Sequence, residues 1–184
     1  MPDFAGVTGR LRRSIVQILS GRGGGSGVIW DARGLIVTNA HVAPGADAGI
    51  IDSSGKRSLA RVILRDRERD LALLQPATDL SLAPPEIGDS DSLRAGQLVL
   101  ALGNPLGLTG AIAVGIIHAA GPFPPRNWMQ ADVRLAPGNS GGILADAGGR
   151  VIGITTMIFN GLALAVPSNE VEAFVRRVYL KKTA

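Results

Sequence analysis

Short runs of Val, Ile and Leu alternate with clusters of Gly, Pro, Asn and Asp along almost the whole chain. Runs of this length, bounded by turn residues, are typical of β-strands, and together they predict an all-β sandwich or barrel. Residues 31–34, 52–55 and 146–149 support this, because their Asp and Gly tolerate the positive φ of tight turns. The predicted strands are 14–19, 26–30, 35–38, 49–52, 59–64, 71–75, 98–102, 110–118, 128–131, 142–144, 151–157 and 162–166.

One stretch divides these strands into two groups. Residues 78–92 are rich in Pro, Asp and Ser, show weak periodicity and have strand-rich segments on both sides. We therefore expect a single domain over 1–184, made of an N-terminal β lobe (13–77), an inter-lobe linker (78–92) and a C-terminal β lobe (93–167).

The chain is expected to end in a helix over 168–182. Residues 167–169 read Pro-Ser-Asn, a typical helix start, and Glu follows in the first turn with Lys and Arg towards the end. Helical spacing places four apolar residues on one face, namely Val171, Phe174, Val175 and Val178.

Composition excludes several function classes. The 184 residues contain no cysteine, which rules out thiol catalysis, disulfides and zinc–thiolate sites, and their two histidines cannot form a His-x-x-x-His zinc motif. The formal charge of +4 comes from basic residues that are dispersed and mixed with acids, so no nucleic-acid partner is expected. The longest apolar stretches, such as 111–117, are too short to cross a bilayer, so no transmembrane segment is expected.

The compartment stays open at this point, because residues 1–20 do not have the pattern of a signal peptide. The protein is cytoplasmic if Met1 is its native start, and belongs to the cell envelope or is secreted if the chain is an excised domain. The glycine-rich residues 21–27 match no phosphate-binding pattern and precede strand-like sequence, so a flexible hairpin loop is expected there.

Residues 137–142 (Pro-Gly-Asn-Ser-Gly-Gly) carry the strongest chemical signal. Glycines around Ser140 allow a sharp turn that exposes the hydroxyl and points backbone N–H groups into one space. An α/β-hydrolase is excluded because there the histidine follows the serine, whereas His41 and His118 both precede Ser140.

The order His, Asp, Ser is available instead. His41 follows a predicted strand, and Asp70 begins an apolar run that can draw its carboxylate into a half-buried position beside the imidazole. This places His41 and Asp70 in one lobe and Ser140 in the other, with a cleft between them. Asp66 is the alternative acid, but charged residues flank it on both sides and give it no reason to be buried. His118 is expected to be a strand residue satisfied by hydrogen bonding.

These segments resemble motifs of the HtrA/Deg family of serine proteases, and the similarity runs from about residue 13 to 175 in the family's order. The resemblance implies two six-stranded antiparallel β-barrels of the trypsin/chymotrypsin type with a C-terminal helix. The matching segments are 25–29, 36–42, 69–74, 101–107, 137–142 and 165–169.

The same resemblance implies a serine endopeptidase that cleaves unfolded or flexible polypeptides through an acyl-enzyme. Ser140 would be the nucleophile, His41 the general base and then acid, and Asp70 the group that orients the imidazole. The N–H groups of Gly138 and Ser140 would form the oxyanion hole. Substrate would be bound by Leu135 and by one strand that comprises Ile154, Thr155, Thr156 and Met157.

The chain departs from the family pattern at Ile143, where Pro is common, and at Ala136, where Asn is usual. If Arg134 lines the specificity pocket, it would disfavour substrates with Lys or Arg immediately before the scissile bond. If Arg134 points to solvent, Leu135 lines the pocket, and small aliphatic residues are preferred at that substrate position. No PDZ domain is expected. Family members often trimerise through N-terminal aromatic residues, and with Phe4 here a homotrimer is an open expectation.

A second function stays open alongside the protease. The chain could be a latent or inactive protease-fold module that binds exposed polypeptide segments, because a flip of the peptide between Pro137 and Gly138 would disarm the site without changing a residue. Neither function needs a metal or a cofactor, and both take polypeptide as partner.

Overall fold

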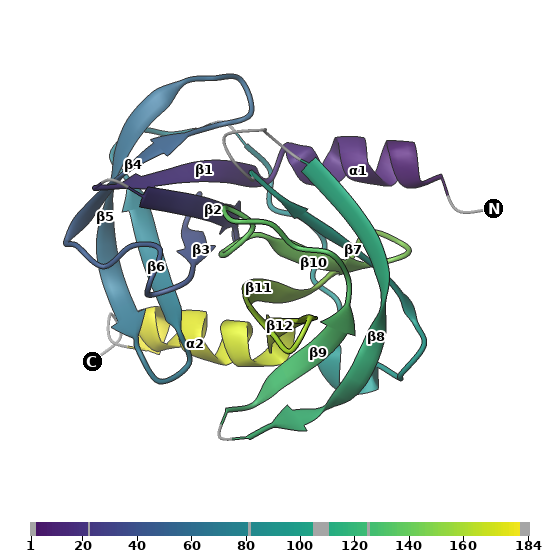
Figure 1. Cartoon of the computed structure of the whole chain (residues 1–184). Helices are drawn as coiled ribbons and strands as arrows, with labels where there is room; N and C mark the ends of the chain where they lie inside the picture. Colours follow the sequence, from purple (N-terminus) through teal and green to yellow (C-terminus); the bar gives the residue numbers. More distant parts are fainter. Residues whose placement is uncertain (1–2, 22, 81, 105–110, 125, 181–184) are drawn as a thin grey trace.

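Two closed antiparallel barrels of six strands each make up most of the molecule (Figure 1). The computed structural model describes residues 3–21, 23–80, 82–104, 111–124 and 126–180. The expectation of two six-stranded barrels followed by a helix is confirmed. Gly110, Lys181 and Lys182, which the sequence placed in a strand and in the last helix, lie outside the described residues, as does part of the matching segment 101–107.

The strands pair in the same order in both barrels, β1-β2-β3-β6-β5-β4 and, for the second, β10-β11-β12-β9-β8-β7. The first barrel consists of β1 (Ile15–Ser20), β2 (Gly23–Ile29), β3 (Ile36–Thr38), β4 (Asp47–Ile51), β5 (Arg57–Asp66) and β6 (Leu71–Pro76). The second consists of β7 (Leu98–Gly103), β8 (Ala111–Phe123), β9 (Trp128–Asp132), β10 (Ile143–Asp146), β11 (Val151–Phe159) and β12 (Leu162–Pro167).

Successive side chains of a strand point to opposite faces of the sheet, and this divides the buried apolar residues among three clusters. Val16 of β1 lies inside the first barrel and Val99 of β7 inside the second. Their neighbours Ile15 and Leu100 point the other way and join a third cluster, which draws residues from both barrels and from the last helix. This shared core fixes the two barrels against each other, and with them the candidate site residues that each barrel contributes.

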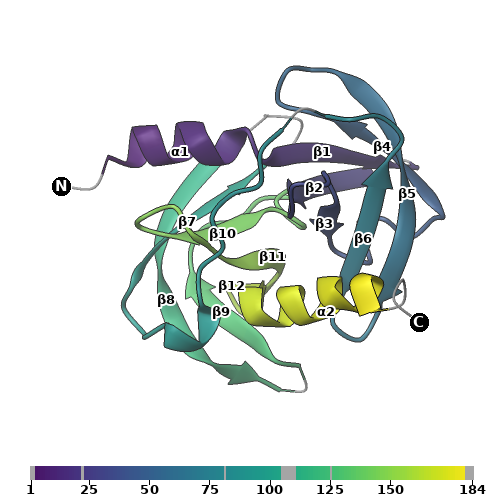
Figure 2. The same cartoon turned by 180° about the vertical axis from the view of Figure 1, so that it is seen from behind.

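The C-terminal helix α2 (Ser168–Leu180) lies across both barrels, as Figure 2 shows from behind. Its predicted stripe is confirmed for Val171, Phe174 and Val175, which are buried in the shared core. The connection before β7 contains a short 3-10 turn, Ser90–Ser92, and Ile87 forms an isolated bridge with Val151 of the second barrel.

A helix that the sequence did not reveal, α1 (Phe4–Arg12), precedes the first strand. Asp3 caps it by accepting a hydrogen bond from the N–H of Gly6 at 2.9 Å. Only Val7, Thr8 and Leu11 are buried, and two glycines weaken the helical pattern, which explains why it was missed.

The expectation of a flexible hairpin loop is wrong for residues 23–27, because Gly23–Ile29 forms β2 and the last five residues of this strand are buried. Gly24, Gly25 and Gly27 are needed for close approach rather than for mobility. A Cβ atom on Gly25 would lie 2.7 Å from the carbonyl oxygen of Ser140, so β2 can touch the serine loop only without a side chain there. No helix in the described ranges is long and apolar enough to span a membrane.

Candidate active site

His41 and Asp70 form a hydrogen-bonded pair at one end of the first barrel. His41 follows β3, and Asp70 stands directly before β6 with a φ of 57°. The His41 Nδ1 atom lies 2.8 Å from Asp70 Oδ2, and the backbone N–H of His41 donates to Oδ1 at 3.1 Å. Asn39 holds the turn by donating from Nδ2 to the carbonyl oxygen of Asp70 at 3.0 Å. The pair is thus fixed by backbone as well as side-chain contacts.

The second barrel contributes one more donor to Asp70. The Thr156 hydroxyl of β11 donates to Oδ2 at 2.6 Å, in a buried position. Burial is the largest influence on Asp70 and would raise its pKa, but hydrogen bonds from His41 and Thr156 outweigh it. The pKa of Asp70 is therefore lowered, and the carboxylate stays ionised beside an imidazole ring that is about half exposed.

Ser140 lies in the loop between β9 and β10, which is tied to β11 on both sides. The N–H of Gly141 donates to the carbonyl of Thr155 at 2.8 Å, and the Thr155 hydroxyl donates to the carbonyl of Asn139 at 2.6 Å. Gly141 has a φ of 81°, and a Cβ atom there would lie 2.1 Å from the carbonyl oxygen of Ser26. Glycine is required at this position.

Ser26 of β2 anchors the same loop from the first barrel, a role that sequence reasoning missed. Its hydroxyl donates to the carbonyl of Gly138 at 2.8 Å and accepts from the N–H of Asn104 at 2.8 Å. Its own N–H donates to the carbonyl of Ser140 at 2.8 Å. A polar residue between two glycines in a buried apolar strand was the available signal, because buried hydroxyls need partners.

The Ser140 hydroxyl donates to the carbonyl oxygen of Thr156 at 2.7 Å. This acceptor belongs to the same barrel, so the hydroxyl is directed at β11 instead of at the imidazole of His41. Within the described part of the chain, the N–H groups of Gly138 and Ser140 donate to no acceptor.

A cavity of about 620 Å³ brings the predicted residues from both barrels together. Of the predicted residues, His41, Asp70, Leu135, Ser140, Thr156 and Met157 line it. Gly138 does not line it, and neither do Ile154 and Thr155, which are buried between β10 and β12. Arg134 is exposed and also outside the lining, whereas Arg65, Arg67 and Arg126 are lining residues that the sequence did not reveal.

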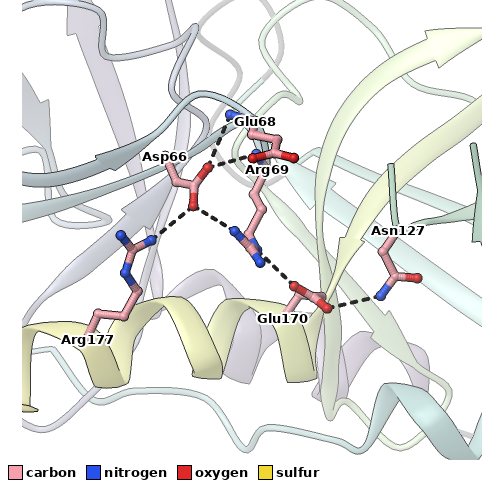
Figure 3. A network of polar contacts seen from close by, with 6 residues as sticks. All are labelled: Asp66, Glu68, Arg69, Asn127, Glu170 and Arg177. Carbon is pink, nitrogen blue, oxygen red and sulfur yellow. Dashed lines mark hydrogen bonds and ion pairs between the residues drawn. The ribbon is translucent and has the colours of Figure 1, made fainter. Parts of the chain in front are cut away.

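Asp66, the alternative acid, has a side chain that is only 10% exposed, so the expectation that nothing would bury it is wrong. It accepts from the side chains of Arg69 and Arg177, each at 3.0 Å, and Arg69 also binds Glu170 (Figure 3). Burial would raise the pKa of Asp66, but these hydrogen bonds and charges lower it. The network joins the β5–β6 hairpin to α2 and leaves Asp66 away from His41. His118 is exposed on β8.

The paired barrels define the chymotrypsin-type fold, and comparison with known proteins agrees. Residues 25–154 match the family described as trypsin-like peptidase domain. A probable periplasmic serine protease Do/HhoA-like of Haemophilus influenzae is 36% identical over 85% of this chain and 37% of its own length. The periplasmic serine endoprotease DegP of Escherichia coli is 37% identical over 80% of this chain and 34% of its own.

Solved structures lead to the same group. The structure titled HtrA-type protease AlgW with tripeptide has a TM-score of 0.89 and 32% identity, over 96% of this chain and 64% of that one. The chain belongs to the trypsin-like peptidase domains, in the HtrA/DegP family of serine proteases. It spans about a third of the length of these two curated relatives.

Proposed function

We propose that this chain is a serine endopeptidase that uses Ser140, His41 and Asp70 to hydrolyse peptide bonds in unfolded or flexible polypeptides. The observation that carries the proposal is the hydrogen-bonded His41–Asp70 pair, at 2.8 Å, lining one cavity with Ser140. The relatives are named serine endoproteases, which supports the same chemistry.

The reaction begins when the Ser140 hydroxyl rotates from the Thr156 carbonyl towards His41 Nε2. His41 takes the hydroxyl proton as Oγ attacks the substrate carbonyl carbon, and Asp70 stabilises the imidazolium through Nδ1. The N–H groups of Gly138 and Ser140 donate to the oxyanion. His41 then protonates the leaving amine. In the second step His41 takes a proton from the water that attacks the acyl-enzyme, and it then returns a proton to Ser140 Oγ.

The free edge of β11 is the proposed docking site for the substrate backbone. On the β10 side, pairing ends at Ile154, so the edge from Thr156 onward has no strand neighbour in the described residues. Met157, Ile158 and Phe159 on this stretch are exposed apolar residues. An extended peptide added there would gain main-chain hydrogen bonds without requiring a particular sequence, which suits unfolded substrates.

The residue before the cut is proposed to be small and aliphatic. Leu135 and Ala136 line the cavity beside Ser140, whereas Arg134 is exposed and does not. A Lys or Arg side chain that entered this apolar part of the cavity would lose its water and find no carboxylate to pair with, so its binding is disfavoured.

A second function, a latent module that binds polypeptide without cutting it, is favoured by one observation. The Ser140 hydroxyl donates to Thr156 and so is not poised towards His41 in this conformation. Catalysis then depends on how readily that hydrogen bond is exchanged.

Cleavage of unfolded casein by the chain and by Ser140→Ala, measured side by side, tests the first function. Hydrolysis that is lost in the variant supports it, and the cut sites report the preference before the scissile bond. A phosphonylating serine probe separates the second function: persistent lack of labelling at Ser140, with retained binding of casein, would favour the latent module.

A homotrimer stays a prediction. Phe4, on which it rested, begins α1 and packs partly against the shared core. Sedimentation equilibrium of the chain measures the state directly, and a Phe4→Ala variant that remained a trimer would remove this residue from the explanation.

A further inference from the structure

The candidate cleft has an unbalanced positive charge. Three arginines, Arg65, Arg67 and Arg126, line it together with His41. The single carboxylate in the lining is Asp70, and it is already bound by His41 and Thr156. An anionic group that entered the cleft would therefore meet three cations and no unbound carboxylate in the lining.

These arginines lack the carboxylate partners that others in the protein have. In the described chain no ion pair involves Arg65, Arg67 or Arg126, whereas Arg69 and Arg150 each bind a carboxylate at 3.0 Å or less. Other arginines of the described residues, such as Arg57 and Arg94, also form no ion pair, but Arg65, Arg67 and Arg126 lie together in the lining of one cavity.

Two of the three side chains are held in place without being neutralised. Arg65 donates to the carbonyls of Ala43 and Gly45, and its Nε atom is buried without a hydrogen-bond partner. The Arg126 guanidinium stacks on the ring of Trp128, 4.6 Å from its centroid. Both cations are thus pre-positioned, which lowers the entropy lost when a ligand binds.

Of the two acids that lie near Arg126, Glu170 is bound by other side chains. A smaller cavity that Arg126 also lines contains Glu68 and Glu170. Glu170 is bound by Arg69 and Asn127, and neither acid forms an ion pair with Arg126.

The arginines lie where one side of a bound peptide would pass. Arg65 and Arg67 lie at the β5–β6 hairpin and Arg126 at the β8–β9 hairpin, so both barrels contribute, and Met157 and Ile158 line the same cavity. A peptide that adds antiparallel to β11, like that strand's other neighbours, places residues N-terminal to the scissile bond beside Ile158.

We propose, on the basis of the proposed endopeptidase function, that this cleft selects polypeptide segments with acidic side chains two to four residues before the cut. Arg65, Arg67 and Arg126 bind those carboxylates, while Leu135 and Ala136 receive the residue at the cut. A peptide fits better than a nucleic acid because the open β11 edge and its apolar side chains offer no row of stacking platforms for bases.

Two peptides with the same aliphatic residue at the cut test the proposal, one with Asp-Glu-Asp and one with Asn-Gln-Asn before it. We expect kcat/KM to be about threefold to tenfold higher for the acidic peptide at low salt, with the ratio shrinking as salt screens the charges. Arg67→Gln with Arg126→Gln should bring the ratio close to one. Arg94→Gln, an exposed arginine outside the cavity, is the matched control and should leave it unchanged.

Binding by Ser140→Ala, followed by fluorescence anisotropy of the same labelled peptides, separates this inference from the proposed function. Tighter binding of the acidic peptide without cleavage by the unmodified chain would support the arginine site and overturn the endopeptidase. Cleavage with equal preference for both peptides would support the endopeptidase and overturn the arginine site. Stronger binding of a single-stranded oligonucleotide than of the acidic peptide would overturn the peptide assignment.

Discussion

The two barrels hold their parts of the site in different ways. In the first, His41 and Asp70 contact each other directly, and backbone and Asn39 hydrogen bonds fix the turn that carries Asp70. In the second, the Ser140 hydroxyl has a backbone acceptor in its own barrel, Thr156. The proposed base and its orienting acid are therefore preorganised, whereas the proposed nucleophile must exchange a hydrogen bond before it can react.

Thr156 and Ser26 form contacts that cross between the barrels and limit how far these parts can move independently. Thr156 of the second barrel donates to Asp70, and Ser26 of the first donates to the Gly138 carbonyl in the serine loop. The comparison therefore predicts that variants within the His41–Asp70 pair abolish activity, and that variants at the crossing contacts reduce it.

The largest effect is expected for Asp70→Asn. The amide cannot accept the Nδ1 proton and orient the ring as the carboxylate does, so kcat should fall by about 10⁴-fold with the fold retained. Casein hydrolysis measures this, and Asp66→Asn is the matched control that should keep kcat within about twofold. A comparable loss from both variants would contradict the assignment of Asp70 as the orienting acid.

Ser26→Ala tests the anchor that reaches the serine loop. The variant leaves the Gly138 carbonyl and the Asn104 N–H without their buried partner, which costs about 1–3 kcal/mol of stability. We expect kcat to fall about 10- to 100-fold because the loop loses its fixed position. Urea unfolding and the rate of phosphonate labelling measure the two effects, with Ser53→Ala, at an exposed serine of the β4–β5 turn, as control. Normal labelling in a destabilised variant would restrict Ser26 to a structural role.

Sequence alone predicted the strands well because their apolar runs are short and their turns are rich in Gly and Asp. It failed at the first part of β2: a strand was predicted over 26–30, but residues 21–27 were expected to form a loop, and β2 begins at Gly23. The sequence does not distinguish a glycine in a loop from a glycine that allows a close backbone contact. Here the contact is with Ser140, which belongs to the other barrel. The position of Ser26 depended on the same long-range packing.

The residue types of the candidate site and the contact of Asp70 with the His41 imidazole were predicted, but the contact of the Ser140 hydroxyl was not. The spacing of His41, Asp70 and Ser140 indicated which side chains could meet, and the structure brings them to one cavity. It could not indicate that the Ser140 hydroxyl donates to Thr156, because that depends on a side-chain rotation. The burial of Ile154 and Thr155 depends on pairing with β10 and β12, which a single strand's sequence does not show.

Thr156→Val tests the contact to Asp70 while keeping the backbone carbonyl that Ser140 uses. The Thr156 hydroxyl lowers the pKa of Asp70, so its removal should raise that pKa. Activity should fall about tenfold, and the acid limb of the pH–kcat profile should move to higher pH, because Asp70 is then protonated at a higher pH. Thr156→Ser retains the hydroxyl and should retain the profile. A fall in activity with an unchanged pH limb would indicate a packing effect instead.

The smallest effect is expected at the Asp66 network, which joins the β5–β6 hairpin to α2. Asp66 has a pKa below its ordinary value of 3.8, since Arg69 and Arg177 outweigh its burial. A lowered pKa means that this contribution to stability is present above about pH 4 and is lost as the pH falls through the folded-state value. Because both arginines are about half exposed, the contribution is expected to be only about 1 kcal/mol.

Asp66→Asn should therefore be less stable than the unmodified chain by about 1 kcal/mol at pH 7, and the difference should vanish towards pH 2. Urea unfolding at several pH values measures it, and Asp47→Asn, which removes only an exposed ion pair with Arg61, should leave the curve unchanged. A difference that stayed constant with pH would mean that Asp66 acts through packing. The charge of Asp66 would then not hold the hairpin that carries Asp70, which would depend on its own turn, on Asn39 and on apolar packing against α2.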